Sequence, residues 1–182
     1  MKRLRALEEL PVSVPLPADD VLEHHAARLL LLLRHCGVRG QKIDSLTKMA
    51  KLDFFVRYPE FFAVAAEEEG KTPSLNATQE ARMIRYHYGP WDQRYYHLLA
   101  YLEALGLVTI TRKGRSFQLT LTGDGVRAAD ELTKEQSFNG LIQHMRQVKK
   151  VLGRKTGTRL KNLIYELFER EVAERPLGEE IE

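Results

Sequence analysis

Apolar residues recur at helical spacing just before two segments in which they alternate with polar ones, and this order is the most informative pattern in the chain. Between Tyr95 and Leu105 they occupy every third or fourth position, as they do on the buried face of an α-helix. Gly106 is suited to end this helix. Residues 107–111 and 116–121 then alternate and are rich in β-branched side chains, so they predict the two strands of a hairpin.

The segment between the strands, residues 112–115, is basic and contains a glycine, as expected of an exposed hairpin tip. Helix, strand, tip and strand follow one another in the order of a winged helix-turn-helix. Gly89 and Pro90 are a turn signal, and the helix is expected to begin within a residue or two of them. The predicted fold is mainly α with a small β-hairpin: a winged helix-turn-helix core plus a C-terminal helical hairpin.

Three further helices are predicted ahead of this core. The first is capped by Asp19 or Asp20 and contains five consecutive leucines, so it should be the central, buried helix. The second spans residues 41–57, and the third spans residues 60–69 with Pro59 in its first turn.

Residues 82–88 mix helical and strand signals, so both conformations remain open; one option is a small first strand that pairs with the wing. After the wing, a helix is expected from about residue 122 to residue 132. The apolar stripes of residues 138–152 and 159–172 predict two helices that form an αα-hairpin. The resulting plan is an extended leader (1–18), the winged-helix core with a helical insertion (19–133), the αα-hairpin (134–175) and a tail (176–182).

Charge is distributed unevenly along the chain, although the formal net charge is only +3. Residues 144–161 contain seven basic residues and no acid, whereas residues 166–182 contain seven glutamates and two arginines. An anionic partner beside the basic segment and ordinary solvation of two helix faces are both consistent with this pattern.

The sequence indicates a cytoplasmic protein. Cys36 is the only cysteine, which excludes a disulfide within the chain. Prolines interrupt the apolar residues that follow the basic N-terminus, so a signal peptide is not expected. No apolar run approaches the roughly 20 residues of a membrane span.

The chain contains no pattern typical of a catalytic, metal or nucleotide site. His24 and His25 are adjacent and therefore point to different faces of a helix, which does not suit a shared metal ion. Cys36 closes a leucine-rich helix and is expected to be a small core residue rather than a nucleophile. Neither glycine-rich phosphate-binding motif occurs. We therefore expect no enzymatic activity, no cofactor and no bound metal.

The helix before the wing is the first candidate for contact with DNA. Opposite its apolar stripe lie Gln93, Arg94 and His97, whose side chains can reach base edges or phosphates. Ala100 and Ala104 lie farther along the same face and suit close packing on another protein. Phosphate contacts are expected from basic residues of the tip and of the 144–161 segment. These are Arg112, Lys113, Arg115, Lys149, Lys150, Arg154 and Lys155.

Aromatic residues gather just before this helix and in its first turn. Stacking on bases, a protein interface and a stiff buried junction are the three interpretations that the pattern leaves open. The residues are Tyr86, Tyr88, Trp91, Tyr95 and Tyr96.

Three sequence blocks in this region resemble a known family. They read LDFFVRYP at residues 52–59, EARMIRYHYGPWD at residues 80–92 followed by RYY at residues 94–96, and GTRLKNLIYE at residues 157–166. Together they resemble the middle component of bacterial ABC-three-component systems, a winged-helix family that includes the middle subunits of Lamassu-type defence operons. The resemblance implies a non-catalytic subunit that links an SMC-like or Rad50-like ABC ATPase to an effector, commonly a nuclease, in defence against phage or plasmids. It assigns no catalytic residue.

The partners implied by the resemblance are the ATPase subunit and the effector subunit; double-stranded DNA is a further candidate, and no membrane is expected. Candidate contacts with a protein partner are Tyr165 and Phe168, and the helix face formed by Ala100, Tyr101 and Ala104. The alternative function is a stand-alone winged-helix transcription regulator, which would read an operator as a dimer.

Overall fold

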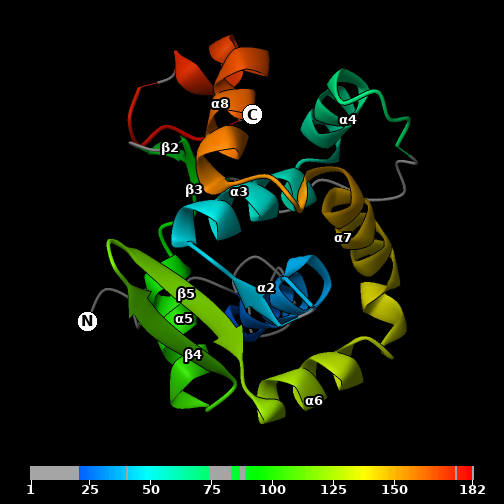
Figure 1. Ribbon diagram of the computed structural model, residues 1–182, viewed down its shortest axis with the longest axis vertical. Helices are drawn as coiled ribbons and strands as arrows, with labels where there is room; N and C mark the ends of the chain where they lie inside the picture. The colour runs from blue at the N-terminus through cyan, green and yellow to red at the C-terminus, as the bar shows by residue number, and fades with distance from the viewer. Residues whose placement is uncertain (1–20, 40, 74–82, 87–88, 175, 182) are drawn as a thin grey trace, which may run out of the picture.

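The structure is a computed structural model that describes residues 21–39, 41–73, 83–86, 89–174 and 176–181 (Figure 1). Its α-helices are α2 (Leu22–Cys36), α3 (Leu46–Arg57), α4 (Pro59–Glu68), α5 (Tyr95–Ala104), α6 (Gly123–Leu132), α7 (Asn139–Leu152) and α8 (Gly157–Leu167). A 3₁₀ turn, η2 (Gln136–Phe138), precedes α7, and a π-helical turn, η3 (Glu169–Ala173), follows α8. The strands are β1 (Lys42–Ile43), β2 (Ile84–Tyr86), β3 (Gly89–Trp91), β4 (Val108–Lys113) and β5 (Ser116–Leu121). The fold is mostly helical with small antiparallel sheets, as the sequence predicted.

Helix α2 lies at the centre of the molecule. Its five consecutive leucines, residues 29–33, are at most 2% exposed, because α3, α5, α6 and α7 pack around them (Figure 1). The prediction of a central buried helix is therefore confirmed. The expected capping residues Asp19 and Asp20 lie outside the described part of the chain, and Val21 occupies the N-cap position.

The segment before α3 is a strand, not the first turns of a helix. Residues 41–57 were expected to be helical throughout, but Lys42 and Ile43 pair with β5 as the short strand β1. The Ser45 side chain then accepts a hydrogen bond from the Lys48 backbone N–H, which caps α3. A serine cap four residues after the predicted start thus sets the true start of this helix.

Strands β1, β5 and β4 form one antiparallel sheet in that order. The β4–β5 hairpin has the predicted strands, but its turn is tighter than expected: Arg112 and Lys113 pair with Phe117 and Ser116. Only Gly114, with φ of 61°, and the residue after it form the turn. The basic side chains therefore lie along the end of a two-stranded ribbon.

Residues 84–86 resolve the ambiguity of the 82–88 segment as a strand, but not as a partner of the wing. Strand β2 pairs with β3, so that Ile84 lies opposite Trp91 and Tyr86 opposite Gly89. Helix α5 consequently begins at Tyr95, later than the Gly89–Pro90 signal predicted, because that dipeptide belongs to β3.

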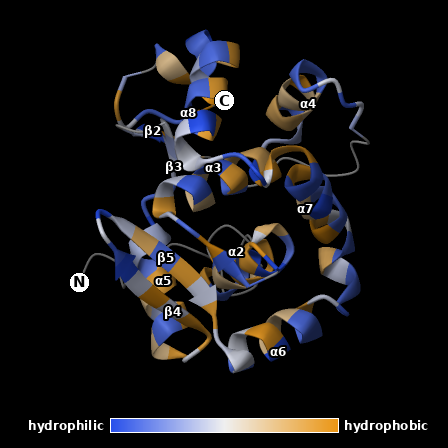
Figure 2. Cartoon of the chain, in the orientation of Figure 1, coloured by the Kyte–Doolittle hydropathy of each residue, from blue (hydrophilic) through white to orange (hydrophobic). Residues whose placement is uncertain are grey.

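Helices α7 and α8 pack mainly on other helices and not on each other as the expected αα-hairpin. Helix α7 packs against α2 and α3, whereas α8 packs against α3 and α4 (Figure 1). The buried faces of both helices belong to the same hydrophobic cluster as α2, and Figure 2 shows apolar and polar residues interleaved along them. Helix α8 also ends earlier than predicted, at Leu167. No described helix is both long enough and apolar enough to cross a bilayer.

Candidate functional site

Charged side chains from α2, α3 and the start of α5 meet in the interior. We call this group the ionic cluster. Arg28 donates from Nε and Nη2 to the two carboxylate oxygens of Asp53, at 3.1 and 3.2 Å. The Tyr95 hydroxyl donates to Asp53 Oδ2 at 2.7 Å, and Arg57 Nη1 lies 3.8 Å from the same oxygen. Its members are His25, Arg28, Asp53, Arg57, Asp92, Arg94 and Tyr95.

A second carboxylate extends the ionic cluster toward the surface. Asp92 accepts from Arg57 Nη1 at 2.8 Å, and from Nε and Nη2 of Arg94 at 2.9 and 2.8 Å. Burial alone would raise the pKa of Asp92, but the hydrogen bonds from Arg94 and the charge of Arg57 hold it well below its usual value. The imidazole of His25 lies between two guanidinium groups, with Arg28 Nη1 at 2.7 Å and Arg94 Nη1 at 2.6 Å. The cluster therefore ties α2, α3 and α5 together through charge.

The ionic cluster has the properties of a structural element rather than a reaction centre. The side chains of Arg28, Asp53 and Arg57 are fully buried, and Asp92 is 4% exposed. Burial and the neighbouring Asp53 carboxylate raise the pKa of Tyr95 well above its usual value, so this hydroxyl stays a hydrogen-bond donor. Arg94 is already bound to Asp92 and His25, which does not suit the base-reading role that its position on the helix predicted.

The three blocks that carry the family resemblance pack onto one another. The first supplies Asp53 and Arg57, and the second supplies Asp92, Arg94 and Tyr95. The third begins α8 against the start of α3, so closely that a Cβ on Gly157 would lie 3.1 Å from the Lys48 backbone nitrogen. A Cβ on Gly89, in the second block, would be in ordinary van der Waals contact with the Tyr165 ring of the third, at 3.7 Å. Residues far apart in the sequence thus form one continuous nucleus.

Lys51 is a third buried charged residue of α3, on the side facing β3. Its Nζ donates to the Pro90 carbonyl oxygen at 2.9 Å. Burial, with a smaller contribution from the charge of Lys161, lowers the pKa of Lys51 to about 7. The Lys51 side chain, beneath the β2–β3 hairpin, is therefore close to the midpoint of its protonation equilibrium at neutral pH.

This pKa predicts a pH dependence of stability. Between about pH 7 and pH 10.5 the unfolded chain holds a proton on Lys51 that the folded protein has lost, so stability should rise with pH in that window. Urea unfolding should therefore show that the free energy of unfolding of the wild type increases relative to that of Lys51→Met as the pH rises from 7 toward 10. Lys150→Met, at an exposed lysine, is the control and should show no such trend. A constant difference between wild type and Lys51→Met would contradict the prediction.

Aromatic residues line a hollow that Lys51 borders, between the start of α3, the β2–β3 hairpin and the β4–β5 hairpin. Its volume is about 330 Å³. Tyr86 and Tyr96 are 44% and 65% exposed, and their rings lie 6.0 and 5.6 Å from that of Trp91. We call it the aromatic hollow; its lining residues are Ser45, Leu46, Thr47, Lys51, Tyr86, Trp91, Tyr96, Arg115, Ser116 and Phe117.

The predicted aromatic group is thus divided between two environments. Trp91, Tyr86 and Tyr96 face the aromatic hollow, whereas Tyr95 is fully buried in the ionic cluster. Tyr88 lies outside the described residues. A surface of exposed tyrosines beside Arg115 combines stacking faces with a positive charge, which suits nucleic acid or a protein partner.

The remaining DNA candidates, at the start of α5 and on the β4–β5 hairpin, are accessible. Gln93 and His97 are exposed, and so are Arg112, Lys113 and Arg115. Arg115 also borders the aromatic hollow, so the tip of the β4–β5 hairpin and the hollow form one continuous surface.

The basic segment on α7 is only partly available to a ligand. Lys149 donates from Nζ to the carbonyl oxygens of Cys36 and Gly37, at 2.8 and 2.6 Å, and so caps the end of α2. Lys155 is paired with Glu69 at 2.8 Å. Of the four candidates named in this segment, Lys150 and Arg154 are exposed and remain suitable for phosphate contact.

The predicted protein contacts differ in accessibility. Phe168 is 3% exposed and packs on Phe61, with ring centroids 4.6 Å apart, so it belongs to the core; the prediction of an exposed anchor is wrong for this residue. Its side chain completes the buried face of α8 where the helix ends. Tyr165 is half-buried beneath Lys161, whose Nζ lies 5.7 Å from the ring centroid. Ala100 and Ala104 are exposed on α5, and Tyr101 is half-buried.

Sequence reasoning missed the ionic cluster altogether. One signal was present: Asp53 and Arg57 stand four residues apart within an otherwise apolar stretch of α3, where exposed charges are not expected. Within the described residues no group of three or more histidine, cysteine or acidic side chains could hold a metal ion. Burial raises the pKa of Cys36 to about 12, so its thiol is not an activated nucleophile. Comparisons of the chain with protein-family models, with curated proteins and with solved structures found no match.

Proposed function

We propose that the protein is a non-catalytic winged-helix subunit that links an SMC-like or Rad50-like ABC ATPase to an effector nuclease in bacterial defence against phage or plasmids. The observation that carries the proposal is the mutual packing of the three sequence blocks that resemble the middle component of ABC-three-component systems. Tyr95 of the second block donates a hydrogen bond to Asp53 of the first, and Arg57 of the first donates one to Asp92 of the second. The first two blocks thus share one buried network, and the third packs beside them through the contact of α8 with α3.

The order of elements supports a winged-helix core. Helix α2, strand β1 and helix α3 come first, and α5 is followed by the β4–β5 hairpin, with the three strands ordered β1, β5, β4. In this assignment α3 and α5 are the helix-turn-helix, and α4 with the β2–β3 hairpin is inserted between them. The wing is the β4–β5 ribbon, with its basic side chains exposed.

We further propose that the wing and the aromatic hollow contact double-stranded DNA without reading its sequence. Arg112, Lys113 and Arg115 supply positive charge along the ribbon. Arg94 is held by Asp92 and His25, so Gln93 and His97 are the polar side chains that the first part of α5 presents for base edges. On such a surface, contacts with the phosphate backbone of DNA outnumber contacts with base edges, which favours binding without sequence preference.

The alternative function, a stand-alone transcription regulator, makes a different prediction about sequence preference. A regulator should select one operator from a pool of random duplexes and should bind it as a dimer. The subunit should select none, and Gln93→Ala should leave its affinity nearly unchanged. Enrichment of a single palindromic site, lost in Gln93→Ala but retained in the exposed control Gln143→Ala, would favour the regulator.

The purified protein alone is expected neither to hydrolyse ATP nor to cut DNA, since the sequence contains neither glycine-rich phosphate-binding motif and the charged side chains of the ionic cluster are bound to one another. Phosphate release and plasmid nicking should stay at the level of a mock purification. Turnover above that level that disappears in Asp53→Asn or Asp92→Asn, with folding retained by circular dichroism, would show that the ionic cluster is a reaction centre and would contradict the proposal.

A further inference from the structure

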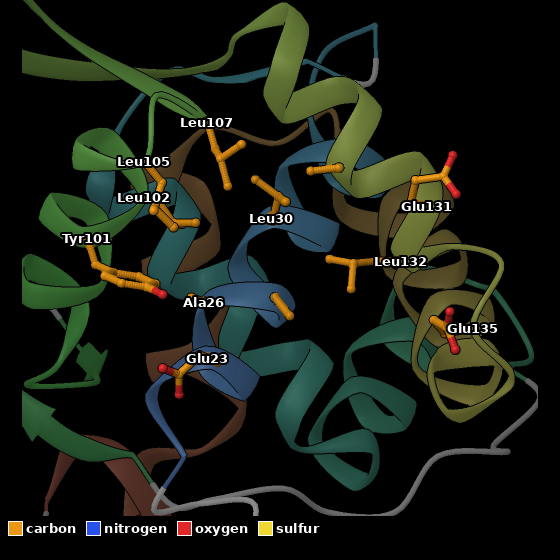
Figure 3. Close-up of a pocket in the computed structure, with 12 residues that line it drawn as sticks. Glu23, Ala26, Leu30, Tyr101, Leu102, Leu105, Leu107, Glu131, Leu132 and Glu135 are labelled. Atoms are coloured by element: carbon orange, nitrogen blue, oxygen red, sulfur yellow. The ribbon is translucent and has the colours of Figure 1, made fainter.

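An apolar groove opens on the face of the molecule opposite α8, between α2, α5 and α6. Figure 3 shows Leu30 and Ala26 of α2 at its floor, and Tyr101, Leu102 and Leu105 along the α5 side. Its volume is about 380 Å³, within the range of about 300–1,000 Å³ typical of binding pockets. The residues that line it are Glu23, Ala26, Ala27, Leu30, Tyr101, Leu102, Leu105, Leu107, Ala128, Glu131, Leu132 and Glu135.

The groove is not simply core that is exposed by loose packing. Leu30 and Leu102 are 2% exposed and form a dense floor, whereas Leu105 is 53% exposed at the rim. Leu105 and its apolar neighbours thus form an exposed apolar patch, and a patch of this kind is stabilised when another molecule covers it.

Charge around the groove has one sign. Glu23 stands at one end, and Glu131 and Glu135 stand at the other, as Figure 3 shows, and all three are exposed. No lysine or arginine is among the lining residues. Glu131 is paired with Lys134 at 2.6 Å. Both side chains are exposed and such a pair is weak, so a cation of a partner can replace Lys134 beside Glu131.

We propose that this groove binds an amphipathic helix of a protein partner, with leucine-like side chains on one face and lysine or arginine at both ends. The elongated apolar floor suits side chains at positions i, i+3, i+4 and i+7 of a helix. The acidic rim suits basic residues at both ends of that stripe and disfavours an acidic partner. This inference concerns the chemistry of the occupant and does not rest on the assignment to an ATPase–effector complex.

The test uses three synthetic peptides of about 15 residues, which is near the shortest length of a stable isolated helix. The first has a leucine stripe flanked by lysines, the second replaces the lysines with glutamates, and the third replaces the leucines with serines. Fluorescence anisotropy with the full-length protein should show that the first peptide binds and that the other two bind at least about tenfold more weakly than the first.

Matched variants of the protein assign that binding to the groove. Leu105→Glu should weaken binding of the leucine–lysine peptide about tenfold or more. Leu177→Glu, at a leucine that is 54% exposed outside the groove, should leave that binding unchanged. Glu23→Lys with Glu135→Lys should reverse the preference toward the glutamate peptide. Equal binding of the two charged peptides, or binding unaffected by Leu105→Glu, would overturn the proposal.

Two other occupants would also overturn it. If a second copy of the chain covers the groove, sedimentation should show a dimer that Leu105→Glu converts to a monomer. If the chain's own N-terminal residues cover it, the variant Lys2→Glu, Arg3→Glu, Arg5→Glu should bind the leucine–lysine peptide more tightly than the wild type does. The proposal predicts neither change.

Discussion

Replacing Asp53 with alanine is expected to lower the free energy of unfolding by about 3–5 kcal/mol. The Asp53 carboxylate accepts both donors of Arg28 and the hydroxyl of Tyr95, and these groups are fully buried. Its removal leaves guanidinium charge in the core without a counterion. Urea unfolding followed by circular dichroism measures the loss.

The control is Asp124→Ala, which removes a carboxylate that pairs with Arg127 on the surface of α6, where both side chains are well exposed. That change should alter stability by no more than about 0.5 kcal/mol. A loss below about 1 kcal/mol in Asp53→Ala would mean that water reaches the ionic cluster, and the description of a dry, charge-paired nucleus would be wrong.

The triple substitution Arg112→Ala, Lys113→Ala, Arg115→Ala is expected to weaken binding to any DNA duplex by a similar factor and to reduce the salt dependence of affinity. If each side chain contacts one phosphate, the slope of log affinity against log salt concentration should fall by about three units. Anisotropy titrations with two unrelated duplexes at several salt concentrations measure both effects.

The matched control removes the same charge elsewhere, with alanine at three exposed residues: Arg127 on α6, Lys134 just after it and Arg170 in η3. Its salt slope should equal that of the wild type. A wing variant whose slope stays unchanged while the control loses affinity would place the phosphate-binding surface away from the wing.

The elements with strong local signals were predictable from the sequence. The apolar period of α5, the alternation of β4 and β5 and the proline at the start of α4 act through nearby residues, so they can be read without knowing the fold. The short strand β1 could not be predicted in this way. Two residues carry no periodicity, and Lys42 and Ile43 become a strand only because β5, far along the chain, pairs with them.

The site was less predictable, because its contacts join distant parts of the chain. Asp53 pairs with Arg28, 25 residues earlier, and with Tyr95, 42 residues later. A helical wheel places Arg94 near the outer face of α5, but it cannot show that Asp92 and His25 bind this side chain. The same limit explains Phe168: the apolar stripe of α8 was recognised, but the aromatic residue that covers it, Phe61, lies on another helix.

The central claim, that this protein is a subunit of an ATPase–effector complex, is tested most directly by isolating the full-length tagged protein from its native host and quantifying what accompanies it by mass spectrometry. The proposal predicts an ABC ATPase with a long coiled coil, together with an effector protein, in near-stoichiometric amounts that persist after nuclease treatment. Recovery of a homodimer on one discrete DNA site, without any ATPase, would contradict it and would establish the regulator instead.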